Sequence, residues 1–252
     1  MSNNQEIPEK GEKPERISKR LSRVGICSRR EAERMIAEGR VMVNGKKLKD
    51  PVCLVTSEDA IKVDGALIPL PDDTRLWRFH KPTGCLTSNK DEKGRDTIFD
   101  ILPEGLPRVM TVGRLDMNTE GLLLLTNDGE LARFLEKPDT GWTRRYRVRA
   151  FGAVDEKKLK KLKHGVTIEG VDYQSVDAKL EKEQGDNVWL NVAIKEGKNR
   201  EVRKVMEHIG LQVNRLIRVS YGPFQLGNLE KTQVEEVGRK VLKASLGKKW
   251  FK

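Results

Sequence analysis

The stretch Val112-Gly-Arg-Leu-Asp-Met-Asn-Thr-Glu-Gly-Leu-Leu-Leu-Leu-Thr-Asn-Asp-Gly129 decides how the larger part of this chain folds. Polar turn residues around Asp116 lead directly into an aliphatic run from Leu122 to Leu125. A short apolar run that follows a turn indicates a fully buried strand. A helix is expected next, over Gly129–Glu136.

Three roles compete for the single carboxylate of that turn. Asp116 and Asn118 can bond to nearby backbone N–H groups as a structural turn. A calcium loop is excluded, because its twelfth position would be Asn127 instead of a bidentate glutamate. The third role is a catalytic carboxylate held rigidly at a strand edge, with Arg114 close by to keep it ionised. The residues alone leave the first and third roles open.

Strands and helices alternate around this stretch without the regular spacing of a parallel α/β fold. This pattern favours the α+β class, with a mixed, largely antiparallel sheet over residues 76–230. A linker is expected at 70–75, and residues 231–252 are expected to form a basic tail that is helical with a basic end. The other expected strands are 76–79, 145–151 and 188–194, and the other expected helices are 155–163 and 198–209.

Residues 14–69 indicate a smaller unit of two helices followed by short strands. The first helix should end at Gly25 and the second should run from a Ser28 cap through Ala37, before a hairpin turn at Asn44-Gly45. Residues 16–50 hold 11 basic and 4 acidic residues. Residues 1–13 are expected to be a disordered leader. The arginines expected to face phosphate groups are Arg20, Arg23, Arg29, Arg30 and Arg34.

Composition narrows the class of protein further. The chain has 252 residues, 37% hydrophobic and 35% charged, with a net charge of +11. An excess of this size favours a polyanionic partner, most often nucleic acid. The longest aliphatic run has four residues, far below the roughly 20 of a membrane span, so no membrane association is expected. No secretory signal is visible, which predicts the cytoplasm. The three cysteines and three histidines are too scattered for a disulfide framework or a zinc site.

Two more segments each allow two interpretations. Tyr146 alternates with arginines along one expected strand, and it is either a core residue or a ring that stacks on a base. Residues 195–218 hold 7 basic and 3 acidic residues where a strand turns into a helix. That arrangement is typical of a phosphate site, but it also fits a solvated amphipathic helix.

Two resemblances go beyond this level. "SRREAE" at 28–33 and "GRVMVNG" at 39–45 make the N-terminal unit similar to the S4 RNA-binding domain. "GRLD" at 113–116, with Thr119 and "GLL" at 121–123, is similar to the "GRLDxxTxGLL" motif of the pseudouridine synthase family. Together with 144–146 and 194–206, it resembles the branch that joins an S4 domain to a catalytic domain and acts on ribosomal RNA, most like the large-subunit rRNA pseudouridine synthase B type.

The resemblance implies roles for individual residues. Asp116 would be the essential catalytic residue, either as nucleophile at C1′ or as the base that removes the C2′ proton. Tyr146 would stack on the target base, Arg203 would pair with Asp116 with help from Arg114, and Ile194 would line the pocket. Departures from the family pattern are Arg144 for a lysine, His80 for an asparagine and Lys204 for an arginine. Other expected RNA contacts are Lys198, Asn199, Arg200 and Lys204.

The expected function is therefore the isomerisation of uridine to pseudouridine in ribosomal RNA, most of all in the large subunit. The resemblance implies no metal or organic cofactor, and ribosomal RNA or a pre-ribosomal particle as partner. A monomer is the default expectation, since the sequence leaves the oligomeric state open. One alternative is a non-catalytic S4-type RNA-binding or ribosome assembly factor, and another is a synthase for small-subunit rRNA or tRNA. A third is an RNA glycosylase, which needs a second carboxylate such as Glu120.

Overall fold

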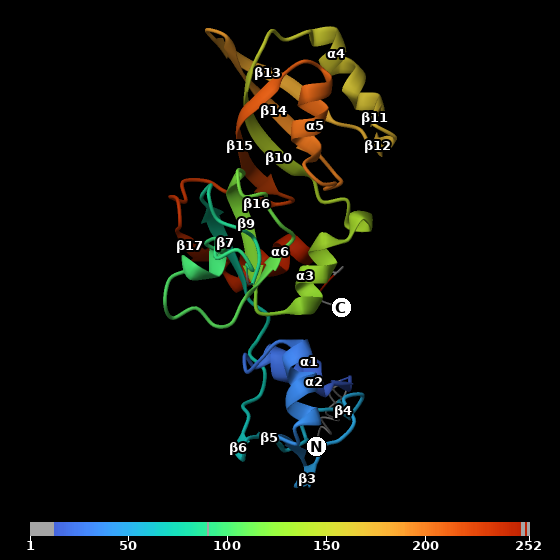
Figure 1. Ribbon diagram of the computed structural model, residues 1–252, viewed down its shortest axis with the longest axis vertical. Helices are drawn as coiled ribbons and strands as arrows, with labels where there is room; N and C mark the ends of the chain where they lie inside the picture. Colours follow the sequence, from blue (N-terminus) through green and yellow to red (C-terminus); the bar gives the residue numbers. More distant parts are fainter. Residues whose placement is uncertain (1–12, 90, 248–249, 251–252) are drawn as a thin grey trace, which may run out of the picture. The chain divides into compact units, whose positions relative to one another are not determined.

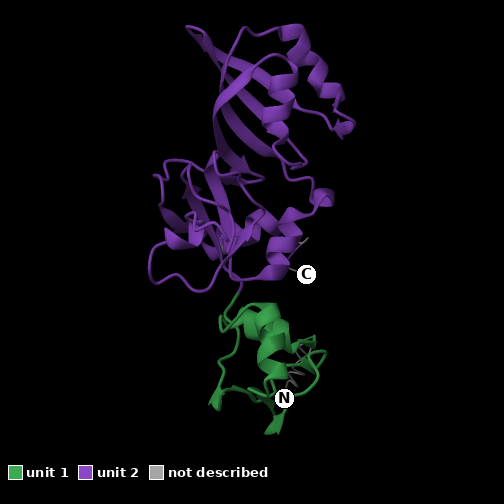
Figure 2. Cartoon of the chain, in the orientation of Figure 1, with its two compact units in different colours: residues 1–73 green, residues 74–252 purple. Residues whose placement is uncertain are grey.

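The computed structural model describes residues 13–89, 91–247 and 250, and it divides the chain into two compact units. Unit 1 spans residues 1–73 and unit 2 spans residues 74–252 (Figure 2). The boundary falls within the expected linker. The leader expected at 1–13 lies almost entirely outside the described residues.

Unit 1 contains the two expected helices, α1 (Ile17–Arg23) and α2 (Arg29–Ala37). The Ser28 side chain caps α2 by accepting a hydrogen bond from the Glu31 N–H at 3.1 Å. A small sheet follows in the order β3 (Lys46–Lys47), β2 (Val41–Val43), β5 (Ile61–Val63), β6 (Ala66–Leu67), while β1 (Glu15–Arg16) pairs with β4 (Leu54–Val55). Unit 1 has its own hydrophobic core, which includes Ile17, Leu21, Ile36 and Val41.

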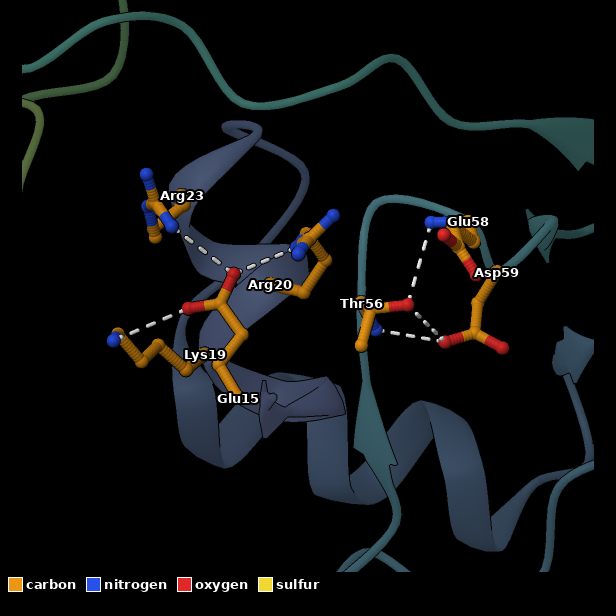
Figure 3. A network of polar contacts seen from close by, with 7 residues as sticks. All are labelled: Glu15, Lys19, Arg20, Arg23, Thr56, Glu58 and Asp59. Carbon is orange, nitrogen blue, oxygen red and sulfur yellow. Dashed lines mark hydrogen bonds and ion pairs between the residues drawn. The ribbon is translucent and has the colours of Figure 1, made fainter. Parts of the chain in front are cut away.

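The expectation that Arg20 faces phosphate groups is wrong. Its side chain is only 2% exposed, and its Nε donates to Glu15 Oε1 at 2.6 Å. Lys19 and Arg23 share the same carboxylate, at 3.2 Å and 3.1 Å (Figure 3). Because Glu15 lies just before α1, its carboxylate pairs with three cations of that helix and stabilises the buried guanidinium of Arg20. Arg29, Arg30 and Arg34 on α2 remain exposed, as expected.

The described strands of unit 2 include a nine-stranded sheet that is antiparallel at all but one pairing (Figure 1). This confirms the predicted mixed, largely antiparallel sheet. Its main path runs β13 (Asp177–Gln184), β14 (Asn187–Ile194), β10 (Arg144–Phe151), β15 (Gln212–Tyr221), β9 (Glu120–Thr126), β7 (Leu76–Lys81) and β17 (Val234–Glu236). β8 (Met110–Val112) pairs with β9 and β16 (Phe224–Gln225) pairs with β15. A separate hairpin joins β11 (Val166–Ile168) to β12 (Val171–Tyr173).

The aliphatic run of β9 is buried on both faces and separates two cores. Leu123 and Leu125 belong to a core that also contains Val148 of β10 and Val205 of α5 (Glu201–His208). Leu122 and Leu124 belong to a second core that the helices α3 (Gly129–Glu136) and α6 (Arg239–Leu246) cover. The helix α4 (Glu156–Lys161) contributes Leu159 to the first core. The continuous leucine run follows from this double burial.

Two boundaries differ from the sequence expectations. The tail expected to be a basic helix from residue 231 first adds the strand β17, which pairs with β7, and only then forms α6. The helix expected over 198–209 begins at Glu201, because Arg200 adopts a left-handed φ of 51° and ends the preceding turn.

The one parallel pairing joins β9 to β15 and depends on a glycine. Gly121 has a φ of +108°, and a Cβ there would lie 2.3 Å from the carbonyl oxygen of Arg218. Only glycine allows the two backbones to approach this closely. The turn that contains Asp116 is thereby fixed beside β15.

Candidate active site

A cleft of about 900 Å³ opens in unit 2 between the turn that precedes β9 and the segment 194–202. Its walls include many of the residues that the sequence singled out. The predicted residues that line it are Arg114, Asp116, Tyr146, Ile194, Lys198, Asn199 and Arg200. Arg203 lies beside the cleft in α5, and Lys204 follows it on the same helix.

The Asp116 turn is held by a buried lysine. Lys81 has no exposed surface, and its ammonium group donates to the carbonyl oxygens of Pro82 at 2.9 Å, of Asp116 at 3.2 Å and of Thr119 at 3.2 Å. Burial lowers the pKa of Lys81. Thr87 adds a bond from its hydroxyl to the Leu115 carbonyl at 2.8 Å. The backbone on both sides of Asp116 is therefore fixed, while its side chain is 34% exposed and lines the cleft.

Two arginines of the 200–203 segment act on this turn in different ways. Arg200 forms an ion pair with Asp116: its Nη1 lies 3.9 Å from Asp116 Oδ2. Arg203, expected to make that pair, donates to the carbonyl oxygens of Asn118 at 2.8 Å and Val213 at 3.0 Å. Burial lowers the pKa of Arg203, Arg200 lowers it further, and Asp116 opposes both effects. Arg203 thus holds the backbone of the turn, and Arg200 contacts the carboxylate of Asp116.

The floor of the cleft is apolar. Tyr146 on β10 is 8% exposed and Ile194 on the neighbouring β14 is 3% exposed. Leu216 of β15 continues this surface. Tyr146 therefore belongs to the core and also lines the cleft, and its stacking on a base stays a prediction.

Arg144, which stood out only as a departure from a family pattern, organises the opposite wall. Its Nη1 donates to the Lys195 carbonyl at 2.6 Å and its Nη2 donates to Tyr221 Oη at 2.9 Å. The guanidinium also stacks over the Tyr221 ring at 4.7 Å. Tyr221 in turn donates to the carbonyl of Leu135 at 2.8 Å. Arg144 therefore fixes the turn that leads into Lys198 and Arg200.

Two acidic residues near the cleft need comment. Glu201 was not predicted as a site residue, and Glu120 was considered as the second carboxylate of an RNA glycosylase. Glu201 is 3% exposed, and its Oε2 accepts from the Lys198 N–H at 2.9 Å. Burial raises the pKa of Glu201 to about 7. Glu120, weighed as a second catalytic acid, is buried and pairs with Arg215 at 2.5 Å and Lys231 at 3.0 Å. These pairs hold the pKa of Glu120 below its ordinary value despite the opposing effect of burial, so it is poorly suited to act as a general acid.

Lys198 also contributes to the rim of the cleft. Its ammonium lies 2.9 Å from Glu196 and 5.6 Å above the ring of Tyr173. Glu196 raises the pKa of Lys198.

Within the described parts of the chain, no group of His, Cys, Asp and Glu is arranged to hold a metal ion. No helix in those parts is long and apolar enough to cross a membrane.

Known proteins resemble this chain in sequence and in fold. The family model described as RNA pseudouridylate synthase matches residues 75–208, and that of the S4 domain matches residues 15–61. An uncharacterized RNA pseudouridine synthase from Rickettsia felis is 45% identical over 228 residues, which cover 90% of this chain and 99% of the relative. The ribosomal large subunit pseudouridine synthase B of Shigella flexneri is 46% identical over 219 residues, which cover 84% of this chain and 75% of the relative. A solved structure named as a crystal structure of pseudouridylate synthase is 26% identical, with a TM-score of 0.63 and coverage of 92% and 99%.

Proposed function

The chain belongs to the RNA pseudouridylate synthase family, and we propose that it isomerises uridine to pseudouridine in large-subunit ribosomal RNA with Asp116 as its catalytic carboxylate. The observation that carries the assignment of the site is the position of Asp116. It is the carboxylate on the rigid turn at the mouth of a cleft with an apolar floor. The substrate class is supported by the relative named as a large-subunit synthase.

The reaction exchanges one glycosidic bond for another. The bond from C1′ to N1 breaks, the uracil turns in place, and a bond from C1′ to C5 forms. N1 gains a proton and C5 loses one, so no atom is added or removed. Asp116 takes part either as the nucleophile at C1′ or as the base that removes the C2′ proton, and both roles require its ionised form.

Cations lie close to the carboxylate of Asp116. Arg200 lies within ion-pair distance of its carboxylate, and the guanidinium of Arg203 is held against the same turn. Arg114 lines the same cleft and adds a third cation.

Tyr146 and Ile194 would hold the detached uracil. A flipped base needs an apolar surface that replaces the stacking it loses in the RNA, which costs a few kcal/mol. The aromatic ring of Tyr146 provides a stacking surface, and Ile194 provides a wall that excludes water. Retention of the base matters because water in the cleft would convert isomerisation into hydrolysis.

The RNA backbone would be bound by the basic residues around the cleft and by unit 1. Lys198, Asn199 and Arg200 lie at the rim of the cleft, and Lys204 follows on α5. The exposed arginines of α2 in the S4 domain, Arg29 and Arg30, would add phosphate contacts. We expect the protein to act as a monomer in the cytoplasm.

Tritium release from C5-tritiated uridine tests this proposal. Transcripts of large-subunit rRNA, small-subunit rRNA and tRNA are incubated with the wild type and with Asp116→Asn, a variant of equal size. We expect release from the large-subunit transcript alone and none with the variant, whose RNA affinity should stay within a few-fold of wild type. Release from another transcript would refute the substrate, and a loss of affinity would make Asp116 a structural residue. Intact binding without release from any transcript would favour an RNA-binding factor.

A further inference from the structure

A second basic surface lies on the face of the sheet opposite the helices α4 and α5. These two helices lie along one face of the sheet (Figure 1). Along β10, Tyr146 and Val148 belong to the core that the helices cover. Because side chains alternate along a strand, Arg145, Arg147 and Arg149 point to the other face. We name the surface formed by Arg145, Arg147, Arg149, Lys182, Trp189 and Arg215 the arginine face.

One row of this surface crosses four neighbouring strands. Lys182 of β13 pairs in register with Trp189 of β14, and Trp189 pairs with Arg149 of β10. Arg149 in turn pairs with Arg215 of β15. Like charges directly opposite each other destabilise a sheet. Arg149 therefore faces a second arginine, and neither residue of that pair neutralises the other.

Part of the charge on this face is neutralised within the protein and part is not. Arg147 stacks over Trp189 at 4.2 Å and donates to both carboxylate oxygens of Glu181, at 2.9 Å and 2.7 Å. Arg215 pairs with Glu120. Arg145, Arg149 and Lys182 take part in none of the ion pairs among the described residues. The face keeps three cations available for an external anion.

We propose that the arginine face binds the phosphate backbone of a second segment of the RNA, apart from the segment that enters the cleft. Arginine forks suit phosphate oxygens better than lysines do, and two of the three free cations are arginines. The face belongs to an extended sheet surface, which suits a long polyanion. This inference rests on the proposed function only in taking RNA as the partner.

The position of the face separates it from the chemistry. The cleft is lined by Tyr146, Ile194 and Leu216, whose side chains lie on the helix-covered side of the sheet. Arg149 and Lys182 are absent from the residues that line it. A short RNA that fills only the cleft should therefore ignore the arginine face, whereas a long structured RNA should contact both.

The test compares two pairs of substitutions that remove the same charge. Arg149→Gln with Lys182→Gln removes two unpaired cations of the arginine face. Lys157→Gln with Lys161→Gln removes two exposed cations of α4, on the other side of the sheet. Kd is measured by filter binding over a salt series, with a large-subunit rRNA transcript and with a short hairpin transcript as probes. Thermal melting checks that each variant is folded, and Arg149→Lys tests whether a retained charge rescues binding.

We expect the arginine-face variant to bind the long transcript about tenfold more weakly at low salt. The slope of log K against log salt should fall by roughly 0.7 to 0.9 for each phosphate group that the variant no longer binds. Binding of the short hairpin should not change, and the α4 variant should differ from wild type by less than about twofold. The inference is overturned by an unchanged slope, by an equal weakening in the α4 variant, or by an equal weakening with the hairpin. It is also overturned if polyglutamate, but not the transcript, binds the variant more weakly, because the partner would then be an acidic protein. These binding data do not depend on tritium release. A failure of the proposed reaction can therefore be told apart from a failure of RNA binding at the arginine face.

Discussion

The free energy of unfolding of the wild type should fall as the pH rises, because Glu201 is buried. Replacement of Glu201 by glutamine should abolish this fall. The buried carboxyl of Glu201 has a pKa of about 7, against an ordinary value of 4.5. Burial is the main cause and the charge of Glu196 adds to it, while Lys198 and Arg144 oppose it. Between pH 4.5 and 7 the folded chain therefore binds more protons than the unfolded chain at this site. The free energy of unfolding must then fall as the pH rises through this window.

The magnitude follows from the difference between the two pKa values. Each pH unit corresponds to about 1.4 kcal/mol, which gives a loss of about 2 to 3 kcal/mol by pH 8. Glutamine keeps an oxygen that can accept the hydrogen bond from the Lys198 N–H but it cannot ionise. Glu201→Gln should therefore gain about 2 to 3 kcal/mol relative to wild type between pH 4.5 and pH 8.

Urea unfolding at pH 4.5, 6 and 8, followed by tryptophan fluorescence, measures this difference. All four tryptophans lie in residues 74–252, so the signal reports unit 2 alone. Glu207→Gln on the exposed side of the same helix is the matched control and should show no such trend. A constant difference between wild type and Glu201→Gln at all three pH values would refute the reasoning, as would the same trend in the control.

Three further predictions concern positioning, packing and the S4 domain. Arg144→Lys keeps the charge but loses the forked contacts of the guanidinium, so RNA affinity should fall several-fold with little change in Tm; a matching drop in Tm would make Arg144 only structural. Gly121→Ala should cost more than about 3 kcal/mol in urea unfolding, because its Cβ would meet the backbone of Arg218. Gly170→Ala, with a φ of +76° and open space, should cost only about 1 kcal/mol, and similar costs for both would contradict the close approach. Removal of residues 1–73 should weaken binding to the rRNA transcript and flatten its salt dependence, whereas an unchanged slope would contradict a phosphate role for the S4 domain.

Local patterns predicted the helices α1 to α5 and the strands β7, β9, β10 and β14, but they did not predict the long strands β13 and β15. Ser28 with Glu31 predicted the start of α2, and the apolar run from Leu122 predicted β9. The motif around Asp116 pointed to the turn that faces the cleft. β17 was not predicted, because three residues with the exposed pattern of Val234–Glu236 show no periodicity that distinguishes a strand from a loop.

The sequence by itself determined the two-unit organisation, the α+β class, the family and the position of the candidate acid, because short-range patterns and one specific motif encode them. Only the tertiary structure decided which cation meets which anion. Arg20 is buried against Glu15, and Arg200 pairs with Asp116. Arg203 donates to two backbone carbonyls instead of a carboxylate. Such choices depend on distances between residues far apart in the chain. The alternation of side chains tells which face a residue occupies, but not what lies opposite it.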